Sequence, residues 1–141
     1  SSSAASDVYK RQPPMFSHVM LGANDLDASV KFYNALLGTL GAKPGVQDRH
    51  RYFWRHAGST FSVTTPINGE PATAANGFTL GFAAESTDQA LQAYEAALAA
   101  GGTAIEDAPG WRGDERMKLF LAYLRDPAGN KVCVMHRPPK A

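Results

Sequence analysis

The chain has 141 residues, of which 44% are hydrophobic and 19% are charged, and its formal net charge is +1. This length and composition favour one globular core, and interspersed charges exclude the basic footprint of a nucleic-acid or anionic-membrane partner. No apolar stretch approaches the roughly 20 residues of a membrane-spanning helix. The single cysteine, Cys133, cannot form a disulfide within the chain, in agreement with a reducing compartment. We therefore expect a soluble, cytoplasmic protein.

The first 14 residues differ in character from the rest. Three serines open the segment, its apolar residues show no periodicity, and Pro13-Pro14 blocks the continuation of any helix. We interpret residues 1–14 as a disordered leader that need not be native, with Met15 as the natural start. A single domain is expected over residues 15–138.

Beyond this leader, one pattern occurs twice, about sixty residues apart. In both copies a segment rich in β-forming residues precedes an apolar stripe at helical spacing, and glycine follows. The first copy has its strand at 16–22 and its helix at 26–40, and the second has them at 78–83 and 88–98. Such duplicated modules predict a site between the copies.

The helix ends have recognisable signals. Asn24 or Asp25 is the candidate N-cap of the first helix, and Gly38 or Gly41 is its left-handed stop. Residues 86–89 have capping-box spacing, with a serine that serves one helix donor and a glutamine that reaches back.

Three further segments of strand length follow each helix, so each module is expected to be β-α-β-β-β. A tight turn at 57–59 and a turn at 126–130 join the last two strands of each module. In the second turn, Pro127 presets φ and Gly129 accepts a positive φ, as a type I turn with a bulge requires. The fold class is thus α+β, with module 1 at about 15–70 and module 2 at about 76–138. The expected strands are 42–47, 51–57, 60–65, 103–107, 118–125 and 131–136.

Three motifs in this arrangement resemble the vicinal oxygen chelate superfamily. They are residues 18–21, residues 25–27 leading to Phe32-Tyr33, and residues 123–131. That superfamily includes glyoxalase I, bleomycin-resistance proteins, fosfomycin-resistance enzymes and extradiol dioxygenases. The resemblance implies paired βαβββ modules that form a cup-shaped mixed sheet, with a ligand and usually a divalent metal inside. It also implies a homodimer in which each site is completed across a two-fold interface.

In metal-dependent members the ligands lie on the first and last strands of each module. Carried over by motif, these positions are His18, Ser62, Phe78 and Cys133. We expect their side chains to converge on the cup interior. Phe78 offers no donor and Ser62 is a poor one, so we predict no metal and no other cofactor. The resemblance therefore supports the fold more than any reaction.

Each of these residues also has a second interpretation. His18 is either a general base or hydrogen-bond donor to a ligand, or a satisfied interior imidazole. Cys133 is a reactive thiol or a small hydrophobic residue. The stripe formed by Phe78, Leu80 and Phe82 has two possible roles. Either it lines an apolar ligand cavity together with Met20 and Met135, or it packs the core.

Two further groups are candidates for ligand binding. Trp54, beside the charged cluster His50, Arg51, Arg55 and His56, either clamps an anionic aromatic ligand or lies next to solvated edge charges. The loop at 106–116 has no counterpart of equal length in module 1. This loop is either a lid or a mobile surface loop. As a lid, it would bring Trp111 onto a ligand and Arg112 to the carboxylate or phosphate of that ligand.

The leading hypothesis is a metal-independent binder of a small apolar or aromatic anionic molecule, of the glyoxalase and bleomycin-resistance type. Whether it catalyses a reaction stays open. One alternative is a metal-dependent lyase, similar to lactoylglutathione lyase, or a dioxygenase that uses other ligands such as His50, His56 or His136. A second alternative is a non-catalytic scaffold. No nucleic acid or membrane is expected as a partner.

Overall fold

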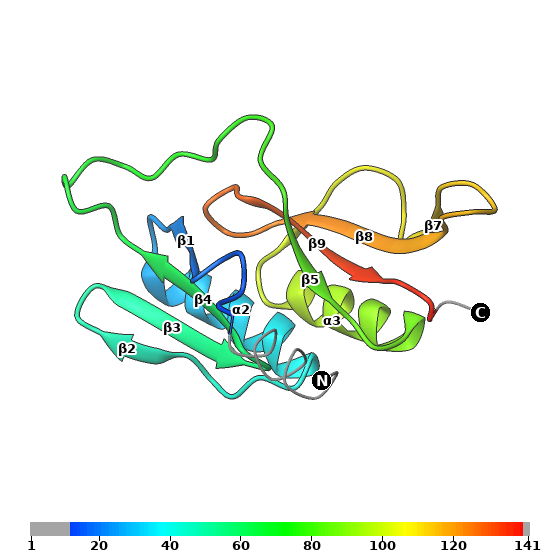
Figure 1. Cartoon of the computed structure of the whole chain (residues 1–141). Helices are drawn as coiled ribbons and strands as arrows, with labels where there is room; N and C mark the ends of the chain where they lie inside the picture. Colours follow the sequence, from blue (N-terminus) through cyan, green and yellow to red (C-terminus); the bar gives the residue numbers. More distant parts are fainter. Residues whose placement is uncertain (1–11, 140–141) are drawn as a thin grey trace, which may run out of the picture.

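A computed structural model describes residues 12–139 (Figure 1). Module 1 forms sheet A, in the order β1-β4-β3-β2, with one helix, α2. Module 2 forms sheet B, in the order β5-β9-β8-β6 with β7 also paired to β8, and one helix, α3. The repeated βαβββ pattern is therefore confirmed, with β7 as an additional strand. The bounds are β1 Val19–Gly22, α2 Leu26–Thr39, β2 Val46–Asp48, β3 Arg51–His56, β4 Ser59–Thr64, β5 Leu80–Ala83, α3 Thr87–Ala99, β6 Thr103–Ala104, β7 Gly110–Arg112, β8 Leu119–Arg125 and β9 Lys131–His136.

Residues 1–11 of the predicted leader lie outside the described residues, and residues 12–14 form neither helix nor strand. Within residues 12–139, no helix is long and apolar enough to cross a membrane.

Both helices begin and end on local signals. The Asp25 side chain accepts a hydrogen bond from the Ala28 N–H, and Ser86 accepts one from the Gln89 N–H. Gln89 reaches back as predicted, but it accepts from the Glu85 N–H, one residue before the Ser86 N–H of a regular capping box. At the other end of α2, Gly41 has a φ of 104°, which favours glycine because a Cβ would be strained there.

The β3–β4 and β8–β9 hairpins close through backbone turns that need positive φ. Gly129 has a φ of 91° and its N–H bonds to the Asp126 carbonyl at 2.9 Å, which confirms the predicted turn with a bulge. In module 1, Ala57 and Gly58 have φ values of 49° and 82°, the sign pattern of a type I′ turn. An alanine occupies a position there that asparagine or glycine normally fills.

The core lies between the two sheets. Helices α2 and α3 pack against each other, and the ring of Phe61 on sheet A lies 5.3 Å from the ring of Phe82 on sheet B. We call the sheet faces that cover this core the inner faces and the opposite ones the outer faces. No strand of sheet A pairs with a strand of sheet B among the described residues. The outer faces are thus directed away from the shared core, and the two mixed sheets with one helix each agree with the predicted α+β fold class.

A linker of residues 65–79 connects β4 to β5 and arches over the molecule (Figure 1). The Asn24 side chain holds its middle by two hydrogen bonds to the backbone of Ala72, one accepted at 2.7 Å and one donated at 3.2 Å. Ala72 also packs on Gly22, where an added Cβ would lie 2.9 Å from the alanine Cβ. The linker is therefore fixed to the end of β1.

Candidate functional site

The predicted metal positions can be aligned between modules by strand register. Val19 pairs with Phe61 in sheet A, and Leu80 pairs with Val132 in sheet B. The preceding residue, His18, therefore corresponds to Thr79, while Ser62 corresponds to Cys133. Because side chains alternate between faces, His18, Ser62, Thr79 and Cys133 all belong to outer faces.

The prediction that Phe78 shares a face with His18, Ser62 and Cys133 is wrong, because the equivalent position is one residue further along, at Thr79. Phe78 lies on the inner side and packs against the core, as do Leu80 and Phe82. This stripe is thus a core element, whereas Met20 and Met135 belong to the outer faces by their pairing with Ser62 and Leu121. A shift of one residue moves a whole stripe to the other face, which explains the error.

Two of these outer-face residues, Ser62 and Cys133, have buried side chains. The Ser62 side chain is fully buried, and its hydroxyl donates to the Val19 carbonyl at 2.9 Å. Cys133 is 6% exposed, and burial raises the pKa of its thiol above the ordinary value. Gly81 beside it has no side chain, and a Cβ there would lie 3.2 Å from the sulfur. Neither residue presents an ionised donor to a metal.

The donor set does not fit the divalent metal that the family implies. Across residues 12–139, no three His, Cys, Asp or Glu side chains are grouped closely enough to hold an ion. The alternative ligands are apart as well: His136 Nδ1 lies 3.0 Å from the Ala84 carbonyl oxygen, and His50 lies in the turn between β2 and β3. His56 is next to Gly41 at the end of α2. His18 is exposed with its Nδ1 2.8 Å from Ser17 Oγ, and its proposed role stays a prediction.

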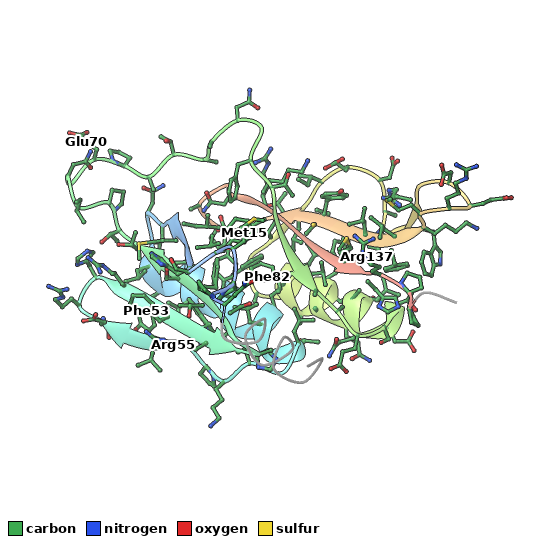
Figure 2. The ribbon with its side chains drawn as sticks, in the orientation of Figure 1. Met15, Phe53, Arg55, Glu70, Phe82 and Arg137 are labelled. Carbon is green, nitrogen blue, oxygen red and sulfur yellow. The ribbon has the colours of Figure 1, made fainter. Side chains whose placement is uncertain are left out.

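The outer face of sheet A carries an apolar row flanked by cations. Met20, Ser62, Phe53 and Val46 are successive cross-strand partners from β1 to β2. On β3, Arg51 and Arg55 alternate with Phe53 on the same face, and the Arg55 guanidinium carbon lies 5.0 Å from the centre of the Phe53 ring. Figure 2 shows Phe53 and Arg55 together on β3. Both arginines belong to the charged cluster predicted from the sequence, whereas Phe53 was not predicted, although strand alternation alone assigns it to their face.

Trp54, by contrast, belongs to the inner face and is a core residue. It is 3% exposed, and its indole N–H donates to Asn34 Oδ1 at 3.0 Å. The same oxygen accepts a hydrogen bond from the Gly45 N–H at 2.9 Å, so α2, β3 and the loop before β2 meet at one amide. Trp54 therefore does not reach the outer face, where Phe53 and its two flanking arginines lie instead.

The predicted lid at 106–116 contains strand β7, which pairs with β8. Trp111 is 49% exposed and lies edge-on to Phe120, on the inner side, with ring centres 5.6 Å apart. The Arg112 guanidinium donates to the carbonyls of Ala108 and Asp107 in its own loop. Trp111 therefore packs the loop against sheet B, whereas Arg112 makes hydrogen bonds within the loop, and the roles of both residues toward a ligand stay predictions.

Comparison with known proteins agrees with this architecture. The family model described as Glyoxalase/Bleomycin resistance protein/Dioxygenase superfamily matches residues 15–134. The chain is 58% identical to a glyoxalase/bleomycin resistance protein from Albidiferax ferrireducens T118, with a TM-score of 0.83, covering 89% of this chain and 100% of that one. No match was found among curated proteins.

More distant structures share the fold. A glyoxalase-related enzyme from Fulvimarina pelagi is 20% identical with a TM-score of 0.68, over 91% of this chain and 94% of that one. A fosfomycin resistance protein from Mesorhizobium loti is 15% identical with a TM-score of 0.62, over 87% and 92%. The duplicated modules, the motif-bearing turn and these matches together establish that the chain belongs to the glyoxalase/bleomycin resistance protein/dioxygenase superfamily.

Proposed function

We propose that the chain binds a small planar molecule with one anionic group, on the outer face of sheet A. The observation that carries this proposal is the stacking of Arg55 over Phe53, at 5.0 Å, beside the exposed Met20 and Val46. A guanidinium above an aromatic ring keeps its N–H edge free for an oxyanion, while the ring and the thioether contact an apolar body. A carboxylate on a planar ligand would meet Arg55 or Arg51 as a bidentate pair.

We further propose that this binding needs no divalent metal. The support is the donor set at the four equivalent positions, in which the Ser62 hydroxyl is bonded to the backbone and Cys133 favours the neutral thiol. A metal-dependent lyase or dioxygenase would need ligands that the described residues do not group together. This alternative is tested by metal analysis of protein purified without chelator, where stoichiometric zinc, nickel, manganese or iron would overturn our proposal.

A second copy of the chain is the proposed partner that closes the site. The outer faces are directed away from the core, and that of sheet A leaves Met20 and Val46 36% and 63% exposed. Apolar area of this kind is commonly covered by association, and a two-fold pair would place sheet A of one copy near sheet B of the other. Light scattering at micromolar concentration tests this, since a species of only 15.1 kDa would contradict it.

Ligand binding is tested with a matched pair of probes, 1-naphthoate and its neutral amide. We expect naphthoate to raise the thermal midpoint, because a ligand of the native state stabilises it, and the amide to have little effect. Arg55→Gln and Phe53→Ala should each weaken naphthoate binding about tenfold, as expected for loss of a cation–π or charge-assisted contact. Arg116→Gln, on the exposed loop between β7 and β8, is the control. An unchanged midpoint with naphthoate and with a panel of other aromatic acids would favour the scaffold.

A further inference from the structure

A second site lies between the end of the linker and the β8–β9 hairpin. A cavity of about 360 Å³ is walled there by residues 74–79, Arg125 and Lys131. In Figure 1 the linker descends to β5 beside the turn that joins β8 to β9. This volume is within the range of about 300–1,000 Å³ typical of small-molecule sites. The cavity is separate from the outer face of sheet A, because its walls come from module 2 and the linker.

The cavity has two cationic side chains in its wall and no carboxylate. Arg125 and Lys131 are cross-strand partners on the outer face of sheet B, and Thr79 precedes the residue paired with Val132, next to Lys131. Strand pairing therefore brings one hydroxyl and two cations to the same end of the sheet. Thr79 and Arg125 are exposed, so a ligand in the cavity can reach both.

Both cations are held in place by contacts with residues that do not line the cavity. Lys131 Nζ lies 2.5 Å from Glu106 Oε2 and 4.9 Å from the centre of the Tyr123 ring. One nitrogen of the Arg125 guanidinium donates to the Gly129 carbonyl at 2.7 Å. A guanidinium has five N–H donors, so its remaining donors are available to a ligand. Because Glu106 offsets Lys131, the two cations and one carboxylate leave one net positive charge.

We propose that this cavity binds the carboxylate of a small aliphatic acid. The planar guanidinium of Arg125 matches a carboxylate, and one net positive charge matches a monoanion better than a phosphate. Ala74 and Ala75, which also line the cavity, give the hydrocarbon part an apolar wall. Bound acid would tie the linker to sheet B. This inference does not depend on the aromatic site of sheet A.

The test is an NMR titration of the whole chain with sodium butyrate at constant ionic strength, with butyramide and inorganic phosphate as matched probes. We expect saturable amide shifts confined to residues 74–79, Arg125 and Lys131, and none of that pattern with butyramide. Arg125→Gln should weaken butyrate binding by about tenfold or more, since a charge-assisted pair is lost. Arg116→Gln, on the exposed loop between β7 and β8, should leave butyrate binding unchanged.

Arg125 also supports the hairpin, so a second variant keeps the test decisive. Lys131→Gln leaves the Glu106 carboxylate without its partner beside the cavity, and should abolish butyrate binding in a protein whose circular dichroism is unchanged. Amide shifts that increase linearly with butyrate concentration without saturating, or that butyramide reproduces, would overturn the proposal that this cavity is a binding site. Phosphate that binds more tightly than butyrate would overturn the carboxylate assignment. Because butyrate has no ring, a failure of naphthoate binding at sheet A would not affect these outcomes.

Discussion

The phenolic hydroxyl of Tyr33 donates a hydrogen bond of 2.6 Å to Oδ2 of Asp126, across 93 positions of sequence. Tyr33 belongs to α2 of module 1, whereas Asp126 opens the turn between β8 and β9 of module 2. The carboxylate is 4% exposed and accepts further hydrogen bonds from the Ala128 N–H and from the backbone and side-chain amides of Asn130. Asn130 also donates to the Gly22 carbonyl at the end of β1. One buried carboxylate thus joins the two modules.

Removing the Tyr33 hydroxyl should weaken this junction. Tyr33→Phe is expected to lower the free energy of unfolding by about 1.5–3 kcal/mol, because a buried charged acceptor loses a donor. Urea denaturation measures the change. Tyr52→Phe is the matched control, since its exposed hydroxyl donates to Gln47 at 3.3 Å and its loss should cost less than about 0.5 kcal/mol. Equal effects of the two variants would contradict the prediction.

The same pair predicts a loss of stability in alkali. Burial, followed by the charge of Asp126 and the hydrogen bond to it, raises the pKa of Tyr33 well above its ordinary value of 10.0. The folded state therefore holds the proton more tightly than the unfolded state does. The resulting stabilisation is complete below the unfolded pKa and is lost as pH rises through the folded pKa. The difference in unfolding free energy between wild type and Tyr33→Phe should stay constant below about pH 10 and shrink as the pH rises above that value. If this free-energy difference instead grew with rising pH, the predicted direction of the pH dependence would be wrong.

Phe78 and Thr79, the two residues that precede β5, should respond very differently to the introduction of one charge. Phe78→Asp is expected to cost at least about 2 kcal/mol of stability, because it places a carboxylate against the core. Thr79→Asp, one residue on, points to the exposed outer side and should change stability by less than about 0.5 kcal/mol. Thermal and urea unfolding of both variants measure the contrast. A stable Phe78→Asp protein would return Phe78 to the ligand-binding candidates.

The β3–β4 turn can be improved. Ala57 has a φ of 49°, which is costly for alanine, and Gly58 follows it. Ala57→Asn creates the Asn-Gly pair favoured in type I′ turns and should raise the free energy of unfolding by about 0.5–1 kcal/mol. Ala57→Val should lower it, because a β-branched residue tolerates positive φ poorly. In urea denaturation, the midpoint of Ala57→Asn should lie above the wild-type midpoint and that of Ala57→Val below it.

The Cys133 thiol should be unreactive in the folded protein. It is 6% exposed, and burial raises its pKa from the ordinary value of 9.0, so little thiolate forms at neutral pH. A disulfide reagent such as Ellman's reagent should react slowly with native protein and at once after unfolding in urea. Rapid stoichiometric reaction with the native chain would show that the thiol is accessible.

The features that the sequence predicted correctly are those set by neighbouring residues. Helix caps at Asp25 and Ser86 and the positive φ of Gly129 follow from hydrogen bonds and sterics within a few positions. The duplicated βαβββ order is likewise a local pattern that occurs twice. Strand alternation was also present in the sequence, and its application to β3 would have grouped Phe53 with Arg51 and Arg55.

Tertiary structure decided which face each strand buries and what lies beside it. The assignment of Phe78 failed because correspondence between modules depends on strand register, and a shift of one residue exchanges the faces. The cavity at Arg125 and Lys131 has a wall from a linker that precedes them by about fifty positions, and no local pattern measures such contacts. The buried hydrogen bond from Tyr33 to Asp126 could not be predicted for the same reason. It forms because α2 packs against module 2, and the residues next to Tyr33 and Asp126 in the sequence do not indicate this contact.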